Sequence, residues 1–72
     1  MDEYRVYQAK DIPTVETGSL YLAMKLDRNG TLHCVGTGQS PEDIAANTYR
    51  GRLGNRAIDD QGREFYLLFS GA

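Results

Sequence analysis

The sequence predicts a small α+β domain, in which one helix covers one face of an antiparallel sheet of four or five strands. Three observations lead to this fold class. Apolar residues alternate at period two in several short stretches, one stretch has helical spacing behind a capping signal, and glycine-containing turns separate the stretches. The elements follow the order β-β-β-α-β-β. We expect residues 1–72 to form a single domain, because a chain of this length supports one small core.

The first two strands are predicted from their alternating side chains. Residues 3–9 place Tyr4 and Val6 on one face and Tyr7 on the other, which leaves open which face is inward. Residues 20–26 form the clearest strand, because one face is wholly apolar and consists of Leu20, Leu22, Met24 and Leu26.

A turn over residues 27–30 joins the second strand to the third. A two-residue Asn-Gly loop would pair Leu26 with His33, whereas a type I turn closed by a left-handed glycine would pair Leu26 with Leu32. We choose the second register, because it keeps one face of the hairpin uniformly apolar. It also places His33 beside Lys25 on the opposite face.

A helix is predicted to begin at Pro41, because Ser40 can cap its free amides and proline suits the first helical position. Apolar and small side chains then recur near the helical period as Ile44, Ala45, Thr48, Tyr49 and Leu53. Gly54 would supply a left-handed stop at the end of this stripe. Alternatively, the helix ends earlier at Arg50, because Gly51 is unfavourable in a helix interior.

A second hairpin is predicted at the end of the chain. Residues 57–58 form its short first arm, residues 59–62 its turn and residues 63–69 its second arm. The second arm carries apolar residues on both faces. This pattern is typical of a central strand of a sheet.

The sheet face away from the helix is expected to carry exposed side chains, namely Tyr7, Tyr21, Lys25 and His33. We expect His33 at the surface and Cys34 in the core, because neighbouring residues of a strand point to opposite faces. The lone cysteine excludes an intrachain disulfide, and no stretch resembles a secretory signal or a membrane span. The sequence therefore predicts a cytoplasmic protein without a membrane partner.

No pattern in the sequence indicates catalysis, a cofactor or a metal ion. The glycine-containing residues 36–40 precede a helix, but Pro41 and the acids after it do not suit a phosphate. Asp59 and Asp60 are interpreted as residues of a solvated turn, because aspartate is favoured there. A chain this short also has no room for a substrate pocket beside its core, so we expect that the protein is not an enzyme.

The charge is unevenly distributed along the chain. The net charge is −2 and the isoelectric point is near 5.1, which does not match a protein that coats nucleic acid. Arg50, Arg52 and Arg56 lie in a stretch without acids, so the other residues hold five basic side chains against ten acidic ones. We expect an acidic body with one basic spot.

The candidates for contact with a partner are these three arginines, the tyrosine just before them, two further tyrosines and three acids. Tyrosine and arginine supply binding hot spots and phosphate contacts, whereas acids would face a basic surface on the partner. The arginines have a second interpretation, since cations also complement the dipole at a helix C-terminus. The full set is Tyr49, Arg50, Arg52, Arg56, Tyr7, Tyr21, Glu42, Asp59 and Asp60.

Residues 22–49 resemble the three-strands-plus-helix layout of AP2 and phage-integrase arm-binding domains. The resemblance rests on the Asp-Arg-Asn-Gly hairpin, the Val-Gly-Thr-Gly segment and the Ser-Pro-Glu-Asp helix start. Those domains lay their sheet in the DNA major groove, so the resemblance implies a small nucleic-acid-binding module.

Size and the lack of a catalytic set favour a different function. We expect a small, acidic, non-enzymatic binding protein that blocks a surface of a larger protein or nucleoprotein complex. Many accessory proteins of phages and mobile elements, including anti-CRISPR-like inhibitors, have this size. The alternatives are the nucleic-acid-binding module and a homodimeric regulatory protein that pairs through an exposed strand edge or through the open sheet face.

Overall fold

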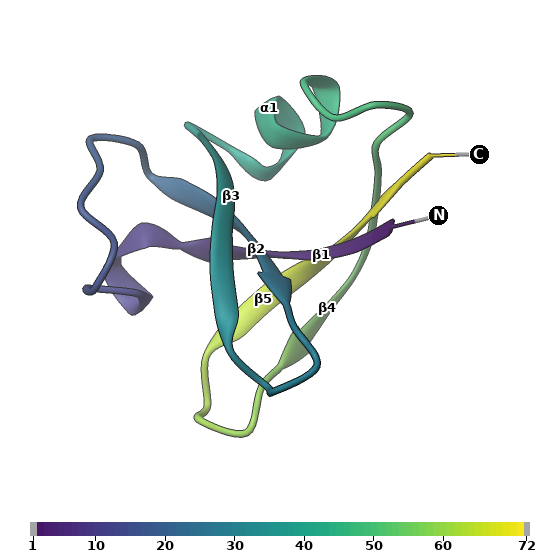
Figure 1. Ribbon diagram of the computed structural model, residues 1–72. Coiled ribbons are helices and arrows are strands. Elements are labelled where there is room, and N and C mark those ends of the chain that lie inside the picture. The colour runs from purple at the N-terminus through teal and green to yellow at the C-terminus, as the bar shows by residue number, and fades with distance from the viewer. Residues whose placement is uncertain (1, 72) are drawn as a thin grey trace.

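The computed structural model describes residues 2–71, and it confirms the predicted α+β class and element order. Five antiparallel strands form one sheet, and a single short helix lies between the third and fourth strands (Figure 1). The elements are β1 (Asp2–Gln8), the 3-10 helix η1 (Ala9–Asp11), β2 (Tyr21–Leu26), β3 (Leu32–Gly38), α1 (Pro41–Ala46), β4 (Arg52–Ile58) and β5 (Glu64–Ser70).

The strands follow the order β3-β2-β1-β5-β4 across the sheet. β1 is the central strand, and a hairpin flanks it on each side, so the tips of the two hairpins lie at the same end of the molecule (Figure 1). β5 has a neighbour on both sides, as its two apolar faces predicted. β3 and β4 are the edge strands.

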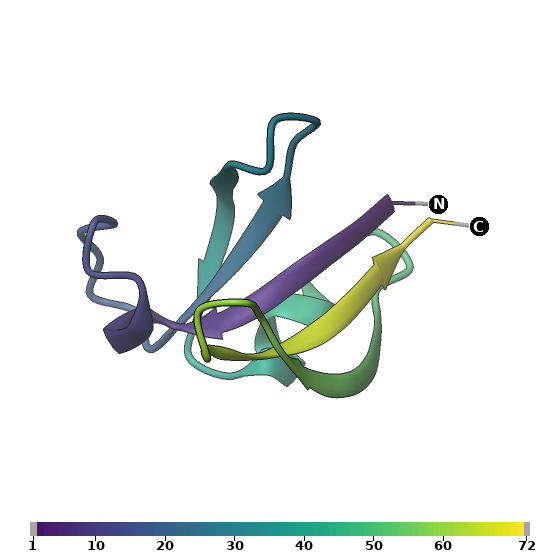
Figure 2. The same ribbon diagram turned by 90° about the horizontal axis from the view of Figure 1, so that it is seen from below.

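Both faces of the sheet are covered, each by a different segment. On one face, Ile44 of α1 packs with Val6, Ala23 and Leu68. We call this the helix face. On the opposite face, which we call the loop face, Ile12 packs against a buried cluster consisting of Tyr7, Leu22, Met24 and Phe65. The sheet is strongly twisted, with α1 against one side of it (Figure 2).

The β2–β3 hairpin has the predicted register. Leu26 pairs with Leu32 and Lys25 pairs with His33, and Gly30 closes the turn at φ 81°. A bulge then adds one residue to β3 opposite the Ala23/Met24 step. Cys34 is exposed, so the expectation that it lies in the core is wrong. Cys34 shares the loop face with its partner Met24, but it lies on an edge strand at the margin of that face.

The helix ends earlier than both predicted positions. α1 stops at Ala46, and Leu53 belongs to β4. Leu53 matched the helical stripe because it packs against the same helix-face cluster, but it does so from a strand. Gly51 is required by a close approach, since a Cβ atom there would lie 2.4 Å from the carbonyl oxygen of Ala45. The left-handed position is Arg50, at φ 48°, and not Gly54.

Candidate functional site

Tyr7 lies on the sheet face away from α1, as predicted, but the expectation that its side chain is exposed there is wrong. Its side chain is fully buried on the loop face, because Tyr7 pairs with Leu22 and shares that residue's face. The predicted face is wrong for Tyr21 and Lys25. Both lie on the helix face, which α1 covers only in part because it is six residues long. Tyr21 is half-buried there. Of the three predicted tyrosines, Tyr49 alone is largely exposed, at 71% of its surface.

The three predicted arginines do not form one patch. Arg50 follows α1 in the turn, and its guanidinium carbon lies 5.5 Å from the ring centroid of Tyr49. Arg52 and Arg56 belong to β4, and they pair with Phe69 and Tyr66, which point to opposite faces of the sheet. Arg56 is also 3.7 Å from Glu64. The expected basic spot at a helix C-terminus is therefore wrong, because the helix ends before these residues.

The three predicted acids have different surroundings. Glu42 is exposed in the first turn of α1, and Asp60 is exposed in the β4–β5 turn. The side chain of Asp59 has only 2% of its surface exposed. The interpretation of residues 59 and 60 as a solvated turn holds for Asp60 and is wrong for Asp59, whose side chain is buried and bonded to Tyr7 of β1.

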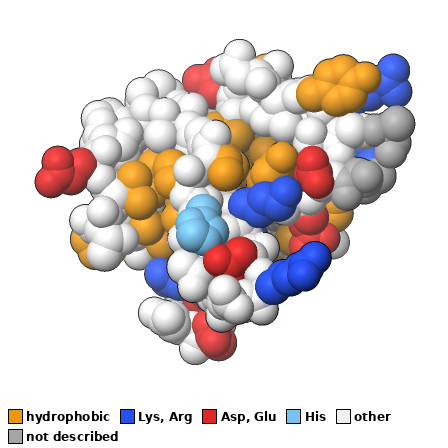
Figure 3. Space-filling model, in the orientation of Figure 1, with side chains coloured by type: hydrophobic (Ala, Val, Ile, Leu, Met, Phe, Trp, Pro, Cys, Tyr) orange, Lys and Arg blue, Asp and Glu red, His pale blue; other side chains and the backbone are white. Residues whose placement is uncertain are grey.

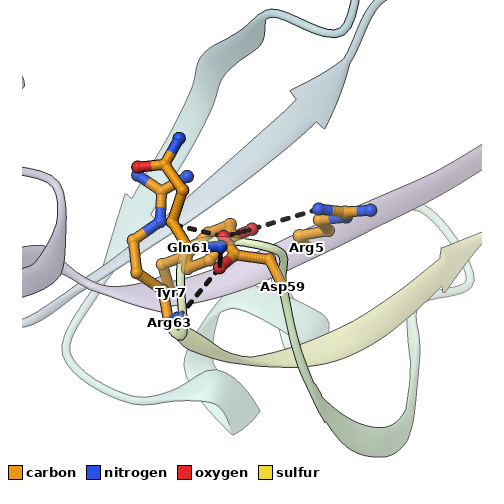
Figure 4. Close-up of polar contacts among 5 residues, drawn as sticks. All are labelled: Arg5, Tyr7, Asp59, Gln61 and Arg63. Carbon is orange, nitrogen blue, oxygen red and sulfur yellow. Dashed lines mark hydrogen bonds and ion pairs between the residues drawn. The ribbon is translucent and has the colours of Figure 1, made fainter.

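Asp59 accepts hydrogen bonds at both carboxylate oxygens. Oδ1 accepts from the backbone amides of Gln61 and Arg63, at 2.9 and 2.8 Å. Oδ2 accepts from Nε of Arg63 at 2.8 Å and from the hydroxyl of Tyr7 at 2.9 Å. Nη1 of Arg5 donates to the same hydroxyl at 3.2 Å, so two guanidinium groups flank the pair (Figure 4).

This network shifts the pKa values of its members in opposite directions. Burial by itself would raise the pKa of Asp59, but the hydrogen bonds from Arg63, Tyr7 and Gln61 outweigh it and hold the pKa at about 2. Burial raises the pKa of Tyr7, and the hydrogen bond from Arg5 opposes that effect. The carboxylate therefore stays charged and the phenol stays neutral.

The β2–β3 turn repeats the same backbone arrangement at the surface. Oδ1 of Asp27 accepts from the amides of Asn29 and Thr31, as Asp59 does in its own turn. Its Oδ2 lies 2.6 Å from Nε2 of His33, and this contact is the leading cause that lowers the pKa of Asp27. In both turns an aspartate oxygen accepts hydrogen bonds from two backbone amides. Only Asp59 also accepts a hydrogen bond from a buried core residue, Tyr7.

An open groove crosses the helix face. Its volume is ≈ 520 Å³, and we call it the helix-side groove. Its apolar lining residues include Tyr4, Val35 and Tyr49, and its polar ones include Asp2 and Asn47. Figure 3 shows hydrophobic side chains at the bottom of this hollow, with acidic and basic side chains beside them. The sequence singled out only Tyr49 from this set.

A second groove, of ≈ 460 Å³, lies between the tips of the two hairpins, and we call it the tip groove. Arg5 and Arg63 line it, together with apolar side chains that include Leu26 and Ile58. Sequence reasoning missed both arginines. Two signals were available in the sequence. Arg5 lies two positions before Tyr7 in a strand and so shares its face, and Arg63 follows Asp59 at the four-residue spacing of an ion pair.

Residues 2–71 contain no group of three or more side chains suited to hold a metal ion. Over the same residues, no helix is both long and apolar enough to cross a membrane. Comparison with protein-family models, curated proteins and solved structures finds no match to this chain. The resemblance of residues 22–49 to AP2 and integrase domains therefore gains no support from relatives.

Proposed function

We propose that this protein is a non-enzymatic binding protein that attaches to a larger protein through the helix-side groove. One observation carries the proposal. Tyr49 stands 71% exposed on the rim of a half-apolar groove, and the guanidinium of Arg50 lies beside its ring. Tyrosine and arginine next to a concave apolar surface are the residue types that dominate binding energy in protein interfaces.

The backbone of Tyr49 is held in place before any partner arrives. Its carbonyl oxygen accepts from the hydroxyl of Ser70 at 2.8 Å and from the amide of Gly71 at 3.0 Å. Ser70 is buried, so the turn after α1 is fastened to the end of β5. Less conformational entropy is lost on binding when an anchor is already ordered, which favours a contact role for Tyr49.

The charge of the chain favours a partner with a basic surface. Glu42 on α1 and Asp2 on the groove wall are both exposed, and the chain as a whole carries −2. An acidic protein is steered toward a basic surface, and such complementarity raises the association rate more than the affinity. Inhibition of the partner and a cytoplasmic location stay predictions.

Nucleic acid is the less favoured partner, because Arg52 and Arg56 point to opposite sides of the sheet. Phosphate contacts along one groove need cations that gather on one surface. A protein partner therefore has the stronger support from the geometry.

Photo-crosslinking in the cells that make the protein tests the proposal. A benzoylphenylalanine at position 49 is compared with one at Leu20, which is 62% exposed and lies outside the helix-side groove. We expect one defined protein adduct from position 49 and none from position 20. Equal adducts from both positions, or an adduct to nucleic acid from position 49, would contradict the proposal.

A further inference from the structure

The tip groove contains a cation that the fold holds rigidly. The guanidinium carbon of Arg5 lies 4.5 Å from the ring centroid of Phe65, and Nη1 donates to the Tyr7 hydroxyl. The side chain is half-buried, so stacking on one side and a hydrogen bond on the other fix its position. One guanidinium carries five N–H donors, and the Tyr7 contact uses one of them.

Arg5 has no carboxylate of its own within the described residues. Among residues 2–71, no Asp or Glu oxygen lies within 4.0 Å of its nitrogens. Asp59 is the acid nearest in the hydrogen-bond network, but its two oxygens already accept four bonds from Arg63, Tyr7 and Gln61. A half-buried cation without a counter-charge leaves strong donors free for an anion.

The remaining groove wall is partly apolar, and its other charged side chains are Asp60 and the paired Asp59 and Arg63. Leu26, Leu32 and Ile58 supply the apolar surface, and Ile58 is 66% exposed. Asp60 lies at the same groove and would repel a doubly charged phosphate more strongly than a singly charged carboxylate. A planar guanidinium also matches a carboxylate with two parallel hydrogen bonds.

We propose that the tip groove binds an aliphatic carboxylate, with Arg5 on the carboxylate and Ile58, Leu26 and Leu32 on the aliphatic chain. Two sources share this chemistry, a free aliphatic acid and the C-terminal carboxylate of a peptide that ends in an apolar residue. The site lies between the tips of the two hairpins and shares no lining residue with the helix-side groove. Experiments can therefore reject carboxylate binding at the tip groove while they support protein binding at the helix-side groove. The opposite result is equally distinguishable.

The test is a titration of isotope-labelled protein followed by NMR, observing the Nε–Hε signal of Arg5 and the amides of both hairpin turns. Hexanoate is compared with hexanol, acetate and inorganic phosphate. We expect saturable shifts at both turns with a dissociation constant on the order of 1 mM for hexanoate, and at least about tenfold weaker effects for the other three. An acetyl-Ala-Leu peptide with a free C-terminus, compared with its amide, distinguishes the two sources of carboxylate.

Two variants keep the proposal falsifiable. Arg5→Met removes the cation, and Ile58→Glu adds a negative charge at an exposed wall position without touching the Phe65 stack. Both should weaken hexanoate binding at least about tenfold, whereas the exposed Arg52→Met control should not change it. Hexanoate shifts that survive Ile58→Glu in a folded protein, or phosphate that binds more tightly than hexanoate, would overturn the proposal.

Discussion

The hydroxyl of Tyr7 donates a 2.9 Å hydrogen bond to Oδ2 of Asp59, a residue 52 positions later in the chain. The bond joins the central strand to the turn of the last hairpin. In the same network Arg63 donates to the Asp59 carboxylate and Arg5 donates to the Tyr7 hydroxyl (Figure 4). In a domain of 72 residues with two thin core clusters, such a buried polar link contributes a sizeable share of the net stability.

Removal of the Tyr7 hydroxyl should destabilise the protein. Tyr7→Phe keeps the buried ring but deprives Asp59 of one donor and Arg5 of its acceptor. We expect the free energy of unfolding to fall by about 1–2 kcal/mol in urea denaturation. Tyr66→Phe is the matched control, because the hydroxyl of Tyr66 makes no hydrogen bond within residues 2–71, and it should change stability little. Equal effects of the two variants would show that the network adds nothing.

The Asp59 carboxylate should contribute to acid sensitivity. Its pKa in the folded protein is about 2, below the ordinary value of 3.8, so its contribution is present above 3.8 and is lost as the pH falls toward 2. We expect Asp59→Asn to be less stable than the unaltered protein at neutral pH. The gap in the unfolding free energy should narrow as the pH falls through that window. A gap that stays constant with pH would rule out an ionised Asp59 as the source of the effect.

Gly51 should not tolerate a side chain. A Cβ atom at this position would lie 2.4 Å from the carbonyl oxygen of Ala45, closer than atoms can pack. We expect Gly51→Ala to cost about 1–3 kcal/mol of unfolding free energy, measured by thermal or urea denaturation. Gly18→Ala is the control, since a Cβ atom at that position would meet no other atom within 4 Å, and that variant should be neutral or slightly stabilising.

The contribution of the α1 N-cap to the free energy of unfolding should be measurable by the same denaturation experiments. The side-chain oxygen of Ser40 accepts from the amide of Asp43 at 3.0 Å. Ser40→Ala should lower the unfolding free energy by about 1 kcal/mol, and Ser19→Ala should not, because the side chain of Ser19 caps no helix. A neutral Ser40→Ala would mean that packing of Ile44 alone holds the helix.

The sequence predicted those parts of the fold that local chemistry determines. The register of the β2–β3 hairpin was predicted from its apolar face, because only one of the two possible turns pairs Leu26 with Leu32. Ser40 and Pro41 marked the helix start for the same kind of local reason. The helix end depended on Leu53, whose partner Leu68 is distant in the chain, and local periodicity could not show that this packing comes from a strand.

The candidate site was harder to predict, because burial on a two-sided sheet is decided by tertiary contacts. Tyr7 and Tyr21 look alike in the sequence, yet only Tyr7 is covered by Ile12 from the loop after η1. Asp59 and Asp60 are neighbours in one turn, and the inward direction of Asp59 depends on Tyr7. Tyr49 is exposed because it lies after the end of α1, in the turn before the left-handed residue Arg50.

The most direct test of the central claim first identifies the partner by crosslinking and then purifies it in its free form. Its affinity for the Tyr49→Ala variant is then measured. Isothermal titration would compare it with the unaltered protein and with Leu20→Ala, which removes another exposed apolar side chain away from the groove. The proposed function predicts at least about tenfold weaker binding for Tyr49→Ala, or about 1.4 kcal/mol, and unchanged binding for Leu20→Ala. Equal dissociation constants for all three proteins would contradict a binding role for the helix-side groove.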